Sequence, residues 1–62
     1  MFYTTIISEA PAIFAYENAD AAYEKFHTEL AYAINQKISI TCIVMDNHGA
    51  IYKSEEYKGL QV

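Results

Sequence analysis

The chain opens with a run of β-branched and aromatic residues, FYTTIIS, at positions 2–8. Such a run is typical of a β-strand, and the Glu9-Ala10-Pro11 sequence that follows is expected to end it. A shorter run of the same kind, AIFAYE, occupies positions 12–17. Because only a few residues separate the two runs, the pattern predicts an antiparallel hairpin with Pro11 in its turn, where a missing backbone N–H does no harm.

The next segment follows a helical period. Asn18 stands before it, where the side chain can cap the first turn, and Asp20 lies inside that turn, where the helix dipole favours negative charge. The pattern predicts one amphipathic helix between the two halves of the chain, ending at about Gln36. Its apolar side chains recur at three- and four-residue steps, and they are Tyr23, Phe26, Leu30, Ala33 and Ile34.

The second half of the chain repeats the strand pattern. KISITCIVM, at 37–45, has the strongest strand character in the sequence. The turn formers DNHG follow at 46–49, with Gly49 suited to a left-handed conformation, and AIYKSEEYK at 50–58 returns as a second hairpin arm. The order predicts a single α+β domain over residues 1–62. We expect a small ββαββ layer, in which one helix packs on one face of a four-stranded, mainly antiparallel sheet.

The strands carry apolar residues on both sides, although one helix can cover only one face of a sheet. An uncovered apolar face larger than a few hundred Å² is uncommon on a soluble monomer. We therefore expect an interface between copies of the chain, sheet face on sheet face or edge to edge, because one patch then serves both subunits. The alternative is that strand twist and the termini hide part of the face. The residues expected at this interface are Tyr3, Ile7, Ile43, Met45 and Tyr52.

Chain length also favours association. A domain of 62 residues buries only about 60% of the surface that its unfolded chain exposes, so it needs a disulfide, a metal or a partner subunit. Cys42 is the single cysteine, and the two histidines, His27 and His48, lack the paired spacing of a closed zinc site. No cofactor is expected, and homo-oligomer formation is the favoured source of stability.

The charge excludes further classes of function. Eight carboxylates and four lysines give a net charge of −4, which argues against a basic patch that binds nucleic acid directly. No apolar stretch approaches the roughly 18–20 residues that span a bilayer. The N-terminus begins with a strand-like pattern and not with a charged segment followed by an apolar one. The sequence predicts a soluble, cytoplasmic protein without membrane contact, and the lone thiol agrees with a reducing compartment.

Glu24 and His27 have the spacing of two ligands in carboxylate-bridged metal sites. Such sites need further ligands from facing helices, and a chain with one helix obtains them only from a second subunit. A histidine beside an apolar stripe is more often a boundary residue satisfied by hydrogen bonds. Catalysis is therefore not expected, and Cys42, in the middle of an apolar strand, is interpreted as a core residue.

Tyrosine is the compositional outlier, with six in the chain beside three phenylalanines. A ring with a polar tip is favoured at interfaces, and Tyr32 falls off the apolar stripe of the helix. His48 is expected at the tip of the second hairpin, where it could contact a partner. The residues expected to bind a partner or a ligand are His27, Tyr32, Lys37, His48, Glu55, Glu56 and Tyr57.

Two stretches, EKFHTELAYAINQ and ITCIVMDNHGAIYKSEEY, resemble a group of short, mostly uncharacterised proteins from phages and prophages of Firmicutes and related gut bacteria. In that group an aromatic-His-Ser/Thr helix precedes a cysteine-containing strand, and a turn leads into a charged last strand that ends in an aromatic residue. The similarity covers most of the chain after Asn18. No activity comes with it, but it implies a phage protein in a bacterial host cell that acts by binding.

Three functions stay open. The first is a small acidic homo-oligomer that inhibits a host defence factor by protein–protein contact. Glu55 and Glu56 would supply negative potential, together with Glu24 and Glu29 on the helix. The second is an oligomeric sponge that holds a small nucleotide in a pocket at a subunit boundary, formed from Tyr32, His27, Lys37 or His48. The third is a metal or acid/base site at Glu24 and His27.

Overall fold

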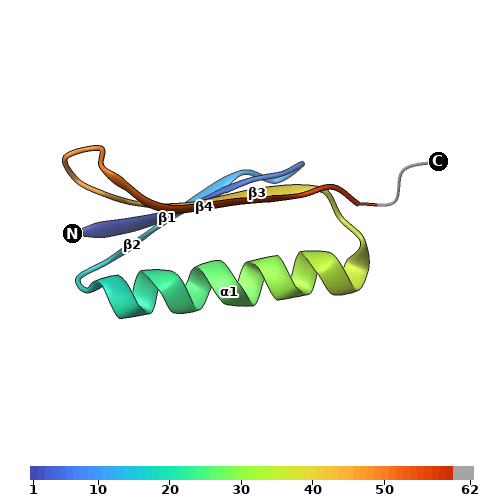
Figure 1. Ribbon diagram of the computed structural model, residues 1–62, viewed down its shortest axis with the longest axis horizontal. Helices are drawn as coiled ribbons and strands as arrows, with labels where there is room; N and C mark the ends of the chain where they lie inside the picture. The colour runs from blue at the N-terminus through green and yellow to red at the C-terminus, as the bar shows by residue number, and fades with distance from the viewer. Residues whose placement is uncertain (60–62) are drawn as a thin grey trace.

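The computed structural model describes residues 1–59, and its elements follow the predicted order. The four strands form one antiparallel sheet in the order β2-β1-β3-β4, and the helix lies along one face of it (Figure 1). The prediction of an α+β fold with one helix on a four-stranded sheet is confirmed. The elements are β1 (Phe2–Ile7), β2 (Ala12–Tyr16), α1 (Ala19–Gln36), β3 (Ile40–Asp46) and β4 (Ile51–Tyr57).

The sheet is joined at its centre by the pairing of β1 with β3. Thr4 in β1 lies opposite Val44 in β3 on one side and opposite Phe14 in β2 on the other. Each half of the chain therefore contributes one hairpin, and the strands β2 and β4 are left at the two edges. The helix packs chiefly over the central strands β1 and β3.

The start of α1 agrees with the sequence pattern. The Asn18 side chain accepts a hydrogen bond from the Ala21 backbone N–H at 2.8 Å, and Asp20 lies in the first turn. This contact satisfies one of the N–H groups that a helix leaves without a partner at its first turn. The predicted cap is confirmed.

The end of α1 explains why β3 starts later than the sequence pattern suggests. Lys37 has a left-handed backbone, with φ 58° and ψ 41°. Its N–H donates to the Ile34 carbonyl at 3.3 Å, and the Ile38 N–H donates to the Ala33 carbonyl at 2.9 Å. This pair of bonds is a Schellman motif, which closes the last helical turn. The predicted strand start at Lys37 is therefore wrong, and the strand begins at Ile40.

The core lies between α1 and the helix-facing side of the sheet. Phe26, Cys42 and Val44 are completely buried there, together with Thr4. The Thr4 hydroxyl donates to the Ala22 carbonyl at 2.7 Å, so the one buried polar side chain of the described residues is satisfied and ties β1 to the helix. The interpretation of Cys42 as a core residue agrees with this burial, which raises the pKa of its thiol.

A β-bulge interrupts the pairing of β3 with β4. Val44 lies opposite Lys53, but Met45 lies opposite Ile51, so Tyr52 is an extra residue without a partner of its own. A bulge of this kind re-aims the side chains that follow it. Ile51 consequently lies on the face of the sheet away from the helix, beside Met45.

The bulge places Tyr52 on the helix side. Its ring lies 5.6 Å from the ring of Phe2 between centroids, and its hydroxyl donates to Asp46 Oδ2 at 2.8 Å. Phe2 and Asp46 oppose each other in the register and share the helix-facing side with the core. The expectation that Tyr52 belongs to the uncovered face is therefore wrong, because strict alternation does not hold through the bulge.

Asp46 also organises the turn of the second hairpin. Its Oδ1 accepts from the backbone N–H groups of His48 at 2.8 Å and Ala50 at 2.9 Å. Gly49 has φ 88° in the same turn, as expected from the sequence. The hydrogen bond from the Ala50 N–H has the largest effect in lowering the pKa of Asp46, and the hydrogen bond from the Tyr52 hydroxyl has the second largest. The hydrogen bond between Tyr52 and Asp46 in turn raises the pKa of Tyr52.

Gly59 fastens the segment after β4 to the segment before β3. Its N–H donates to Ser39 Oγ at 2.9 Å, and the residue is buried. A Cβ atom at this position would clash with the Lys37 carbonyl, lying 2.9 Å from its carbon. Glycine is required here because the two backbones are in direct contact.

Candidate functional site

The face of the sheet opposite the helix is open and largely apolar. No element within residues 1–59 covers it (Figure 1). Ile13 is 69% exposed, Ile51 59% and Ile7 51%. Glu56, at the β4 edge, is the one charged side chain on this face among the strand residues. In register order the face carries the rows Ala15–Tyr3–Met45–Ile51, Ile13–Thr5–Ile43–Ser54 and Ile7–Thr41–Glu56.

Four of the five predicted interface residues lie on this face, namely Tyr3, Ile7, Ile43 and Met45. Tyr52 does not, and two exposed residues were missed. The signal for Ile13 was present, because a hairpin that pairs it with Thr5 puts both on one face. Ile51 could not be found in this way, since only the bulge turns it to the open side.

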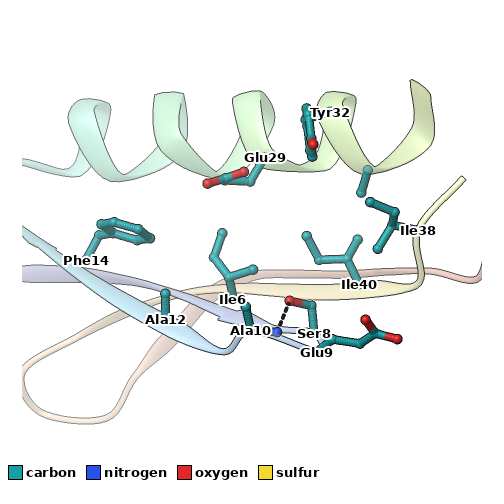
Figure 2. A pocket seen from close by; sticks show the side chains of 11 residues that line it. Ile6, Ser8, Glu9, Ala10, Ala12, Phe14, Glu29, Tyr32, Ile38 and Ile40 are labelled. Carbon is teal, nitrogen blue, oxygen red and sulfur yellow. Dashed lines mark hydrogen bonds between the residues drawn. The ribbon is translucent and has the colours of Figure 1, made fainter. Parts of the chain in front are cut away.

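A pocket of about 300 Å³ lies between the second half of α1 and the ends of the first strands. Figure 2 shows Glu29 and Tyr32 on the helix above Ile6 and Ile40 of the sheet. The pocket exists because small side chains line it: Ala33 on the helix, Ala10 in the turn before β2 and Ala12 at the start of β2. Its other lining residues are Ser8, Glu9, Phe14 and Ile38.

The charges at the pocket are two carboxylates, Glu9 and Glu29. Lys25 Nζ lies 2.9 Å from Glu29 Oε1 and 4.3 Å from the centre of the Phe14 ring. The hydrogen bond with Glu29 raises the pKa of Lys25. Because Lys25 already neutralises Glu29 and no lysine lines the pocket, the arrangement does not favour a phosphate group within a single chain.

The predicted ligand-binding residues are not gathered in one place. Tyr32 lines the pocket, whereas His27, Lys37 and His48 are exposed and are not among its lining residues. The His27 ring stands edge-on to Phe26, with 5.3 Å between ring centroids. His48 lies in the hairpin turn, as predicted. A nucleotide site formed from these side chains would need a second subunit.

Glu24 and His27 are both exposed on α1. Within residues 1–59, no group of three His, Cys, Asp or Glu side chains is close enough to hold a metal ion. Two ligands on one helix do not complete a coordination shell.

The four glutamates expected to supply negative potential lie on two elements, Glu24 and Glu29 on α1 and Glu55 and Glu56 on β4. Glu55 and Glu56 extend from opposite faces of β4, because they pair with Cys42 and Thr41 in turn. Glu29 is in an ion pair on the β2 side of the helix. Tyr57, expected at a surface, is half-buried and packs against the core.

No family model, no curated protein and no solved structure matches this chain. No helix of the described residues is long and apolar enough to cross a membrane.

Proposed function

We propose that the protein acts by protein–protein contact, as a homo-oligomer whose subunits join through the open sheet face. The observation that carries the proposal is the open sheet face over all four strands, which has one charged strand residue, Glu56, at its edge, and on which Ile7, Ile13 and Ile51 are each more than half exposed. A surface of this kind on a small chain is typical of an interface.

The size of the face suits a second copy. Four strands at about 4.8 Å spacing, each with about six residues at about 3.3 Å, span about 400 Å² of flat area. Two copies would bury about 800 Å², and the relief of the side chains brings this toward the roughly 1,200 Å² at the lower end of stable interfaces. With a twofold axis through the face, each contact that a side chain makes across the interface is repeated by the equivalent side chain of the other copy.

The charge distribution also favours a second copy. Each chain has a net charge of −4, so two copies repel at most of their surfaces. Glu56 lies at the edge of the open face, opposite Thr41, and the centre around Ile43 has no charge. The face is the place where two acidic chains can approach with little repulsion.

In the face-to-face arrangement both helices point outward. Their exposed side chains, among them Tyr32 and His27, are then displayed twice and are available to a further partner. We propose a host factor in the bacterial cytoplasm as that partner, inhibited by occlusion. This part of the proposal is supported by the sequence resemblance to phage proteins, whereas the face itself supports self-association.

The test is the substitution Ile51→Lys, measured by native mass spectrometry over a range of protein concentrations. Ile51 is 59% exposed, so the isolated fold tolerates lysine, whereas a buried lysine at the interface is costly. We expect the variant to halve the mass of the assembly, with the dissociation constant of the face contact raised at least about 100-fold, or roughly 2.7 kcal/mol.

The matched control is Ile34→Lys, because Ile34 is 47% exposed but lies on the helix. Its assembly should have the mass of the wild type. A wild-type monomer at high micromolar concentration, or equal assembly masses for the two variants, would contradict the proposal.

A further inference from the structure

The two edges of the sheet differ in how they are protected against pairing with another strand. At the β4 edge, the bulge at Tyr52 and the charged residues Lys53, Glu55 and Glu56 discourage pairing. β2, at the opposite edge, reads AIFAY and has no charge, glycine or proline between Ala12 and Tyr16. Its outer backbone groups are thus a template for one more strand.

The sequence of β2 is complementary to itself in the antiparallel direction. With a twofold axis at Phe14, Tyr16 of one copy lies opposite Ala12 of the other, and Ile13 lies opposite Ala15. Each large side chain then meets a small one, apart from the Phe14 pair on the axis. This register pairs all five residues and keeps Pro11 outside the ladder.

The same register brings a side chain to the pocket. Ala12 and Phe14 line the pocket on the helix side of β2. Because directly opposite residues share a face, Tyr16 of the second copy lies over Ala12, at the mouth of this 300 Å³ cavity. Its ring can cover apolar surface that a single chain leaves open to water, while its hydroxyl stays near Glu9 at the rim.

Charge opposes this contact only at its two ends, where Glu17 of one copy lies opposite Pro11 of the other and so comes near Glu9. The closest carboxylate along the strand is Glu17, which follows Tyr16. In the register centred on Phe14 the two Glu17 residues are separated by about 20 Å along the ladder, well beyond the screening length of about 8 Å at physiological salt.

We infer that β2 pairs antiparallel with β2 of a second copy about a twofold axis at Phe14. The contact joins two four-stranded sheets into one continuous sheet, and Tyr16 of each copy completes the pocket of the other. It uses the edge of the sheet, so it is distinct from the face contact proposed above and does not depend on it.

The experiment is disulfide trapping with the double variant Ile13→Cys/Ala15→Cys, made in the Ile51→Lys background so that the face contact is absent. Both positions are exposed, and Cys42 is buried and stays out of the reaction. Residue 13 lies directly opposite residue 15 of the other copy, where Cβ atoms are about 4.5–5.5 Å apart. After mild oxidation by glutathione disulfide, we expect most of the protein to migrate as a covalent dimer on a non-reducing gel.

Two controls in the same background define the result. Ile34→Cys places an exposed thiol on the helix, away from the edge. Ile13→Cys alone leaves like residues on the diagonal, about 7–8 Å apart and too far for a disulfide. We expect both to form covalent dimers at least about tenfold more slowly. A double variant no faster than Ile34→Cys would overturn the edge contact, and equal trapping of Ile13→Cys alone would overturn the register.

Discussion

Lys37 holds a backbone conformation that glycine adopts without cost, which gives a sharp prediction for the substitution Lys37→Gly. The residue is left-handed, with φ 58° and ψ 41°, at the position where Schellman motifs usually have glycine. A side chain with a Cβ atom costs roughly 1–2 kcal/mol in this conformation. Glycine removes that cost, but its greater conformational freedom in the unfolded chain destabilises the folded state by about 0.5–1 kcal/mol.

Relative to Lys37→Ala, the net expectation for Lys37→Gly is a gain of about 0.5–1 kcal/mol in the free energy of unfolding, which corresponds to a rise in Tm of a few degrees, since about 4–8 °C per kcal/mol is typical of a domain this small. The comparison that isolates the backbone is Lys37→Gly against Lys37→Ala. Both variants lose the lysine charge near the helix C-terminus, which is worth about 0.3–1 kcal/mol, but only alanine keeps the Cβ atom.

The assay is urea unfolding followed by far-UV circular dichroism, at one protein concentration because association adds to apparent stability. The two hydrogen bonds of the motif are backbone contacts, so both variants retain them. The reasoning is refuted if Lys37→Gly unfolds at the same urea concentration as Lys37→Ala or at a lower one.

Two further predictions follow from close contacts. Gly59→Ala should destabilise the fold by about 1–3 kcal/mol, because the new Cβ overlaps the backbone at Lys37; urea unfolding checks this against Lys58→Ala, which should be near neutral. The folded-state pKa of Asp46 is depressed below its ordinary 3.8, so its contribution to stability is present above that pH and is lost as pH falls through the depressed value. In Tyr52→Phe, an NMR titration should show the Asp46 pKa shifted upward yet still below 3.8, because the backbone N–H donors remain, and an unchanged pKa would contradict the assigned hydrogen bond.

The sequence predicts the element order and the start of the helix because these depend on local chemistry. Alternating β-branched residues, the cap at Asn18 and the turn at Gly49 act over a few positions and need no tertiary information. The predicted end of the helix at about Gln36 is confirmed, but the start of β3 was harder to locate, since Lys37 occupies the position where a Schellman motif usually has glycine. The strand order was left open, because it depends on which hairpins meet.

In the candidate site, too, the features that depend on local sequence were predicted and those that depend on tertiary contacts were not. Tyr3, Ile7, Ile43 and Met45 lie on the open face because each belongs to a strand with regular alternation. Ile51 and Tyr52 lie on the faces opposite to those that strict alternation predicts. The reason is that Tyr52 has no partner in the ladder, and no turn-forming residue in the sequence signals this bulge. The pocket was not predicted either. It depends on several alanines that come together only when the helix is laid on the sheet.

The pairing of β1 with β3 at the centre of the sheet also sets the order of events in folding. Thr4 and Val44 meet only after the chain closes a loop that contains β2 and α1. Each hairpin can form rapidly on its own, but an isolated two-stranded hairpin is marginal in water. We therefore expect closure of the central ladder to be the slow, entropically costly step, and the two hairpins to become stable only when it has taken place.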